Sequence, residues 1–113
     1  MQSERLTIVW RFTVKAGREE DFERIYGPNG DWAVLFRKAD GYGGTELHRS
    51  REIPRNYVVI DRWESSDAFK HFKERFRDEY RVLDLRCEEL TEKEEHVGDF
   101  TPVGGHSSKS MSG

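Results

Sequence analysis

An aspartate and a tryptophan stand two residues apart in a stretch that otherwise resembles a buried strand. In NYVVIDRWE (56–64), alternation places Tyr57, Val59, Asp61 and Trp63 on one face. A carboxylate on such a face needs a partner or a shifted pKa, so Asp61 is a candidate base for taking a proton from a bound molecule. A buried ion pair, or a hydrogen bond to a helix, is the alternative.

His48, in TELHRS (45–50), is a second candidate for proton transfer. A neutral imidazole accepts a proton near physiological pH, so His48 could form a catalytic set with Asp61 and Trp63. It could equally be a polar residue on a surface between two subunits.

Large aromatic residues are the second feature that suggests a binding site, since they make up 12% of the chain. The expected walls of a substrate pocket are Trp10, Phe12, Tyr26, Trp32, Phe69 and Phe72. Such rings hold a flat apolar ligand and keep water away from it. Core packing would explain them as well, and for Trp63 it is the alternative to ligand contact.

Composition argues against several other classes of protein. The formal net charge is −3 and basic residues are mixed with acidic ones, so no nucleic-acid surface is expected. The single cysteine, Cys87, permits no internal disulfide and no CxxC metal site. No glycine-rich phosphate loop follows a strand, so neither cofactor nor metal is expected. No signal segment or membrane-length apolar run is seen, so we expect a cytoplasmic protein without membrane contact.

The elements that must position these residues follow from hydrophobic periodicity. Residues 5–15 alternate as a strand. Two helical pieces follow, because GPNG (27–30) interrupts the pattern and Asp31 can cap the second piece. Segments 42–52 and 56–64 predict two strands joined as an antiparallel hairpin.

The rest of the chain predicts a long helix, a strand and a tail. Over 66–90, apolar residues recur every three or four positions, as in a helix with one buried side. A short extra turn is expected at 91–94 and an edge strand at 96–103. Residues 104–113 are small, polar and glycine-rich, so a disordered tail is expected after a single domain of residues 1–103.

This order of elements predicts a split ferredoxin-like α+β fold with an antiparallel sheet. Two helices would cover one sheet face. The other face would carry Thr7, Val9, Thr13, Val58 and Ile60, which is too apolar a set to face water. A second copy could cover it with its own sheet, so a homodimer is expected.

The YVVIDRWESSDAF corner (57–69), the GTELHRS strand (44–50) and the order of elements resemble the antibiotic biosynthesis monooxygenase family. The resemblance spans about Leu6 to Phe100. It implies a dimeric α+β barrel with a cavity in each subunit between the helices and the sheet, bordered by Trp63.

The resemblance also implies two chemistries. One is oxygenation of an aromatic substrate by dioxygen without a cofactor. The other is haem degradation, with His71 in the place of the iron ligand. The haem alternative is less favoured, because His71 lies closer to Trp63 than the family pattern requires and Trp10 stands where the haem-degrading relatives have a polar residue.

The expected function is therefore a cofactor-independent monooxygenase that oxidises a small aromatic or polyketide-like substrate with dioxygen. The alternative is a dimeric module of the same fold that binds a small ligand without converting it.

Overall fold

Four strands form one antiparallel sheet in the computed structural model of the chain, which describes residues 4–104. The strands are β1 (Leu6–Val14), β2 (Tyr42–Arg49), β3 (Asn56–Trp63) and β4 (Thr91–Phe100). Their spatial order is β2-β3-β1-β4, so the predicted ferredoxin-like α+β fold is confirmed. Most of the predicted tail, residues 105–113, lies outside the described residues.

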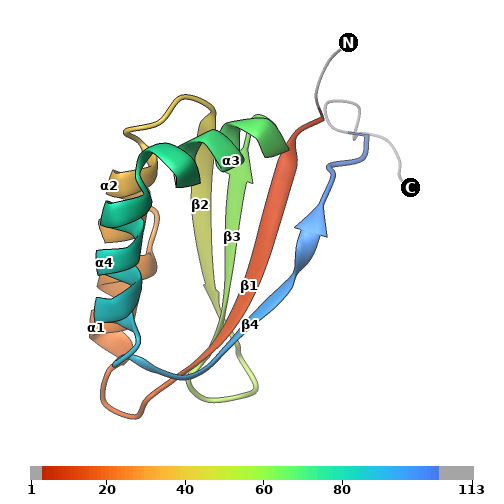
Figure 1. The fold of residues 1–113 in the computed structure, drawn as a ribbon. Helices are drawn as coiled ribbons and strands as arrows, with labels where there is room; N and C mark the ends of the chain where they lie inside the picture. Colours follow the sequence, from red (N-terminus) through yellow and green to blue (C-terminus); the bar gives the residue numbers. More distant parts are fainter. Residues whose placement is uncertain (1–3, 105–113) are drawn as a thin grey trace.

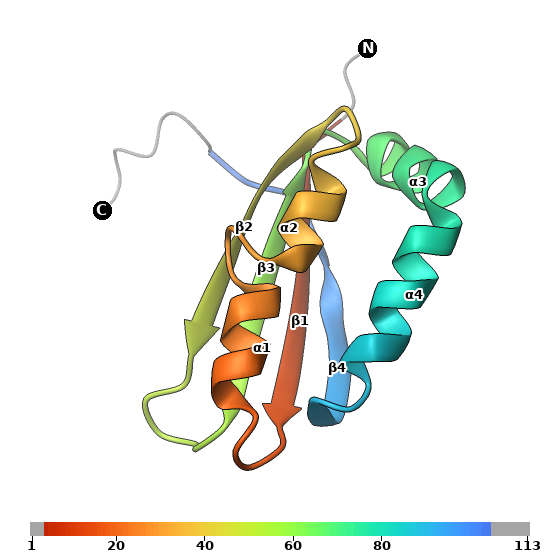
Figure 2. The same ribbon diagram turned by 90° about the vertical axis from the view of Figure 1, so that its left-hand side faces the viewer.

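All the helices lie on one face of this sheet, as Figures 1 and 2 show. They are α1 (Glu19–Tyr26), α2 (Asp31–Phe36), α3 (Ser66–Arg75) and α4 (Arg77–Cys87). None of the helices within residues 4–104 is long and apolar enough to cross a membrane.

The predicted break between α1 and α2 is present and depends on a close backbone contact. A Cβ atom at Gly30 would lie 2.3 Å from the Arg24 carbonyl oxygen, so only glycine fits there. Asp31 is the first residue of α2 but makes no capping bond. Its carboxylate instead accepts from Arg86 of α4 at 3.3 Å, which ties the two helices together.

The single long helix predicted over 66–90 is wrong, because the chain turns at Phe76 (φ −110°, ψ 33°) and continues as α4. Kinks usually occur at proline or glycine, and neither is present here. The turn at 91–94 is also wrong, since β4 begins at Thr91. β4 is an edge strand that pairs with β1, and the register of this pairing is irregular at two places.

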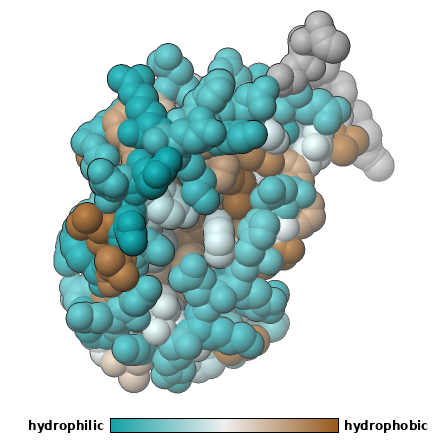
Figure 3. Space-filling model, in the orientation of Figure 1, coloured by the Kyte–Doolittle hydropathy of each residue, from teal (hydrophilic) through white to brown (hydrophobic). Residues whose placement is uncertain are grey.

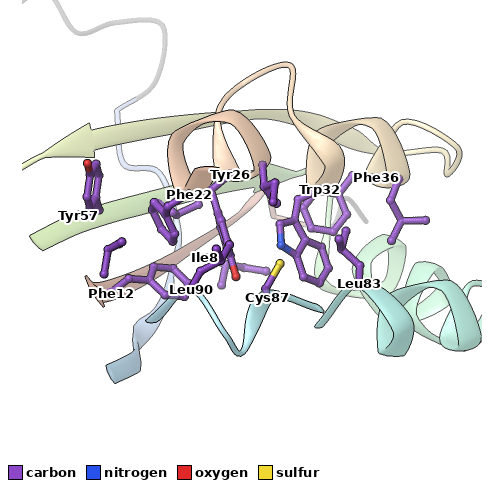
Figure 4. Packing of buried hydrophobic residues seen from close by; sticks show 14 of the residues in the cluster. Ile8, Phe12, Phe22, Tyr26, Trp32, Phe36, Tyr57, Leu83, Cys87 and Leu90 are labelled. Carbon is purple, nitrogen blue, oxygen red and sulfur yellow. The ribbon is translucent and has the colours of Figure 1, made fainter. Parts of the chain in front are cut away.

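The core lies between the inner face of the sheet and the helices. On β1 and β3 it contains Ile8, Phe12, Tyr57 and Trp63, all buried as the alternation predicts. Figure 4 shows part of this core, where Trp32 of α2 lies close to Cys87 of α4. The residues of the outer sheet face, Val9, Val58 and Ile60 among them, are only partly buried, because no helix covers them.

Candidate active site

A cavity of about 50 Å³ lies between the inner sheet face and the helices. Its aromatic walls are Trp10, Phe12, Tyr26, Trp32, Phe36 and Tyr80. Its acidic residues are Asp61, Asp84 and Glu94, and Thr45 and Val59 complete the lining. Figure 3 shows apolar side chains in the gap between the helices and the strands, with polar residues around it.

Asp61 is held in this cavity by a hydrogen-bond chain that starts on β2. Thr45 Oγ1 donates to Asp61 Oδ1 at 2.6 Å. The Tyr42 hydroxyl lies 2.5 Å from Thr45 Oγ1 and must be the donor, because the Thr45 proton is used toward Asp61. The hydrogen-bond partner of Asp61 is thus a strand hydroxyl, and neither the ion pair nor the hydrogen bond to a helix is found within residues 4–104.

Burial sets the proton affinity of Asp61. The side chain is 8% exposed, and desolvation raises its pKa to about 6 while the Thr45 hydrogen bond opposes the rise. No basic side chain within residues 4–104 forms an ion pair with it. Asp61 is therefore mostly ionised at neutral pH, yet basic enough to accept a proton from a bound molecule.

Two further carboxyl groups line the cavity, Glu94 from the edge strand β4 and Asp84 from α4. Burial raises the pKa of Glu94, and the charges of Asp84 and Glu88 add to the rise. Burial and the nearby acids also raise the pKa of Tyr80 to about 12, so its phenol stays protonated. Within residues 4–104 no group of acidic, histidine or cysteine side chains is placed to share a metal ion.

Trp63 lies behind the cavity and is not part of its lining. It is 1% exposed and packs with ring centroids 5.3–5.4 Å from those of Phe36, Tyr42, Phe69 and Phe72. Its indole Nε1 has no hydrogen-bond partner among residues 4–104. The packing interpretation therefore describes Trp63, and the predicted walls Phe69 and Phe72 belong to the same aromatic cluster.

His48 lies on the outer face of the sheet, away from Asp61. Alternation along β2 turns Thr45 inward and His48 outward, where its Nε2 lies 2.9 Å from Glu46 Oε1. The structure does not bring His48 together with Asp61 within one chain. His71 is exposed on α3 and does not line the cavity, so the residues present do not fit a haem iron.

Of the predicted site residues, Asp61, Trp10, Phe12, Tyr26 and Trp32 do line the cavity. Sequence reasoning missed the remaining residues that line the cavity, including Thr45, Tyr80 and Glu94. Thr45 could have been found from the hairpin register, which pairs it with Asp61. Glu94 had been assigned to a turn, and nothing in the sequence signals that β4 begins so early.

A family model for antibiotic biosynthesis monooxygenases matches residues 5–82. The chain belongs to the antibiotic biosynthesis monooxygenase family. No curated protein matches it in a sequence search. The match includes β1, the hairpin with Asp61, and Tyr80, and it ends before Asp84 and Glu94.

Solved structures agree with this assignment. The chain is similar to SnoaB, a cofactor-independent oxygenase from Streptomyces nogalater, with 30% identity and a TM-score of 0.68 over 88% of this chain and 94% of that one. It is also similar to a putative antibiotic biosynthesis monooxygenase from Bordetella bronchiseptica, at 27% identity and a TM-score of 0.65 over 89% and 99% of the two chains. A dabb family protein from Mesorhizobium loti shares the fold alone, at 18% identity, with a TM-score of 0.64 over 90% and 100%.

Proposed function

We propose that this family member is a cofactor-independent monooxygenase that oxidises a small aromatic or polyketide-like substrate with dioxygen. The observation that carries the proposal is Asp61, a buried carboxylate with a pKa near 6 in a wall of aromatic rings. The similarity to SnoaB, a cofactor-independent oxygenase, supports it.

The chemistry asks little of the protein beyond proton removal and shielding. For a substrate of the anthrone type, Asp61 would take a proton from the CH₂ group between two rings. The resulting carbanion passes one electron to dioxygen, and the two radicals combine to form the C–O bond of a peroxide anion. This anion takes back the proton held by Asp61, and the hydroperoxide then loses water, so CH₂ plus O₂ gives C=O plus H₂O.

The surroundings of Asp61 suit this role. The Thr45 and Tyr42 hydroxyls orient one carboxylate oxygen, and the other stays available for the substrate proton. Aromatic walls keep bulk water from the carbanion and from the radical pair. In this role Asp61 is the catalytic residue and Thr45 a positioning residue.

Assembly as a homodimer belongs to the same proposal. The outer face of the two central strands presents Val9, Val58 and Ile60, and on the same strands Arg11 is the register partner of Val58 and Arg62 that of Thr7. A second copy packing its sheet on this face would bury these apolar side chains. His48 lies on this face too, as the second interpretation of that residue expects.

The second candidate is a module that binds a small ligand without converting it, and the size of the cavity limits both candidates equally. An engineered cavity about three times as large binds benzene, so at about 50 Å³ we expect lining side chains to move before an aromatic ligand enters. Trp10 and Tyr80 are only partly buried and are the side chains with room to do so.

Oxygen uptake separates the two candidates. Protein and anthrone are mixed without oxygen, ¹⁸O₂ is admitted, and product is analysed by mass spectrometry. The monooxygenase proposal expects one ¹⁸O atom in each new carbonyl and a rate at least about 100-fold lower in Asp61→Asn. The exposed Asp99→Asn is the matched control. If oxygen uptake with anthrone and with a panel of hydroquinones is no faster than in buffer, the monooxygenase proposal is wrong and the binding module is the candidate that remains.

A further inference from the structure

We propose that the cavity selects an aromatic ligand that carries a protonated amino group, and that it rejects ligands carrying a carboxylate. This inference rests on the proposed function in taking the cavity as the ligand site, and one of its supporting arguments uses the charge that proton removal creates. It specifies the charge that the ligand carries.

The lining has one sign of charge. Asp61, Asp84 and Glu94 face the cavity, and none of its lining residues is lysine, arginine or histidine. An anionic ligand placed among three carboxyl groups would be repelled at short range. A cationic group would meet attraction from each of them.

These carboxyl groups also lack the partners that other acids of the chain have. Asp21, Asp31, Glu23 and Glu46 each form an ion pair with an arginine. No such pair involves the three cavity acids within the described part of the chain, which comprises residues 4–104. Glu94 is exposed on one side, and its partial burial raises its pKa, with the negative charges of Asp84 and Glu88 adding to the rise.

The aromatic walls suit an ammonium group as well as a ring. Cations bind over the faces of tryptophan and tyrosine, and aromatic cages with acidic neighbours recognise amines in this way. Tyr80 makes one such contact within the chain, since Lys73 Nζ lies 5.0 Å from its ring centroid. Lys73 itself does not line the cavity.

The oxygenation step gives a further reason. Proton removal creates a negative charge on the ligand, and the lining residues of this chain supply no cation to stabilise it. An ammonium group on the ligand would supply that charge and would hold its own end beside Glu94 and Asp84. The aromatic end would then lie toward Asp61.

Three matched phenols test the charge preference by titration calorimetry in low salt. They are tyramine (cationic), 4-ethylphenol (neutral) and 3-(4-hydroxyphenyl)propionate (anionic). We expect tyramine to bind at least about tenfold more tightly than 4-ethylphenol and the propionate to bind at least about tenfold more weakly. Added salt should reduce the tyramine advantage.

Glu94→Gln should cut tyramine affinity several-fold and leave 4-ethylphenol unchanged. Glu95→Gln is the matched control, since Glu95 is the register partner of Arg11 and lies on the outer face of the sheet. Thermal melting verifies that both variants fold.

Equal affinity for tyramine and 4-ethylphenol, or tighter binding of the propionate, would overturn the inference and leave the oxygenase proposal standing. Failure of all three phenols to bind would overturn it too, whereas oxygen uptake with anthrone is measured independently. If Glu94→Gln and Glu95→Gln lower the affinity for tyramine equally, the preference would come from the net charge of the protein, and this result would also contradict the inference.

Discussion

Thr45 and Asp61 are direct partners in the β2–β3 register, and the Thr45 hydroxyl donates to the Asp61 carboxylate at 2.6 Å. A buried carboxylate is thus oriented by the neighbouring strand, while its other oxygen remains available. The pairing places a candidate base at a fixed point in an aromatic cavity.

Removing the hydroxyl should raise the proton affinity of the base. The Thr45 hydrogen bond lowers the pKa of Asp61, so Thr45→Val should move it further above about 6. NMR titration of the Asp61 carboxyl carbon measures this directly. Thr45→Ser keeps the donor and should leave the titration in place. An unchanged pKa in the valine variant would mean that the hydrogen bond does not hold in solution.

Neutralising Asp61 should stabilise the protein at alkaline pH. The folded state raises the Asp61 pKa from 3.8 to about 6, so the folded chain binds this proton more tightly than the unfolded chain. Its contribution is complete below pH 3.8 and is lost as pH rises through about 6. Asp61→Asn retains an acceptor for Thr45 and avoids that loss, worth about 3 kcal/mol at most.

Urea denaturation at pH 4 and at pH 8 checks this prediction. The free energy of unfolding of Asp61→Asn relative to wild type should increase between the two pH values. Equal differences at both would indicate that Asp61 titrates normally.

The sequence predicted the fold well because its signals are local. Alternation in β1 and β3 determines which residues face inward, and the GPNG segment identifies a helix break. It therefore located Asp61, Trp10 and Phe12 on the inner face. It could not locate Glu94 or Asp84, since their places depend on the turn at Phe76 and on the early start of β4.

Trp63 illustrates a different limit. Strand alternation predicts that Trp63 faces inward. It does not predict whether an inward aromatic ring lines the cavity or lies behind another ring, because that depends on packing. Phe36, from a helix that begins after an irregular break, stands between Trp63 and the cavity. No periodicity in the chain encodes that order.

Truncation of Trp63 should therefore affect stability more than binding. Trp63→Ala removes a side chain that is 1% exposed and should cost about 3–5 kcal/mol. Trp63→Phe should cost less, because the indole N–H has no partner to lose in the part of the chain that the structure describes. Urea denaturation gives both values. Unchanged stability in the alanine variant, or a Trp63→Phe variant that folds normally yet fails to bind ligand, would contradict the packing role.

The outer face of the sheet should control assembly. Ile60→Asp places a charge at the centre of that face and should weaken a dimer at least about 100-fold. Sedimentation at micromolar concentration would then report a single subunit, while wild type reports two. Val82→Asp, on the exposed side of α4, is the control and should stay dimeric. Wild type that sediments as one subunit would exclude the dimer.

The pH dependence of enzyme-catalysed oxygen uptake tests the central role of Asp61 most directly. With anthrone as substrate, the wild-type rate should rise with pH through a midpoint near 6, and His48→Ala should follow the same curve within about twofold. Asp61→Asn should lose the catalysed rate at every pH. A rate that is flat across this range, or an Asp61→Asn variant as active as wild type, would show that Asp61 is not the base.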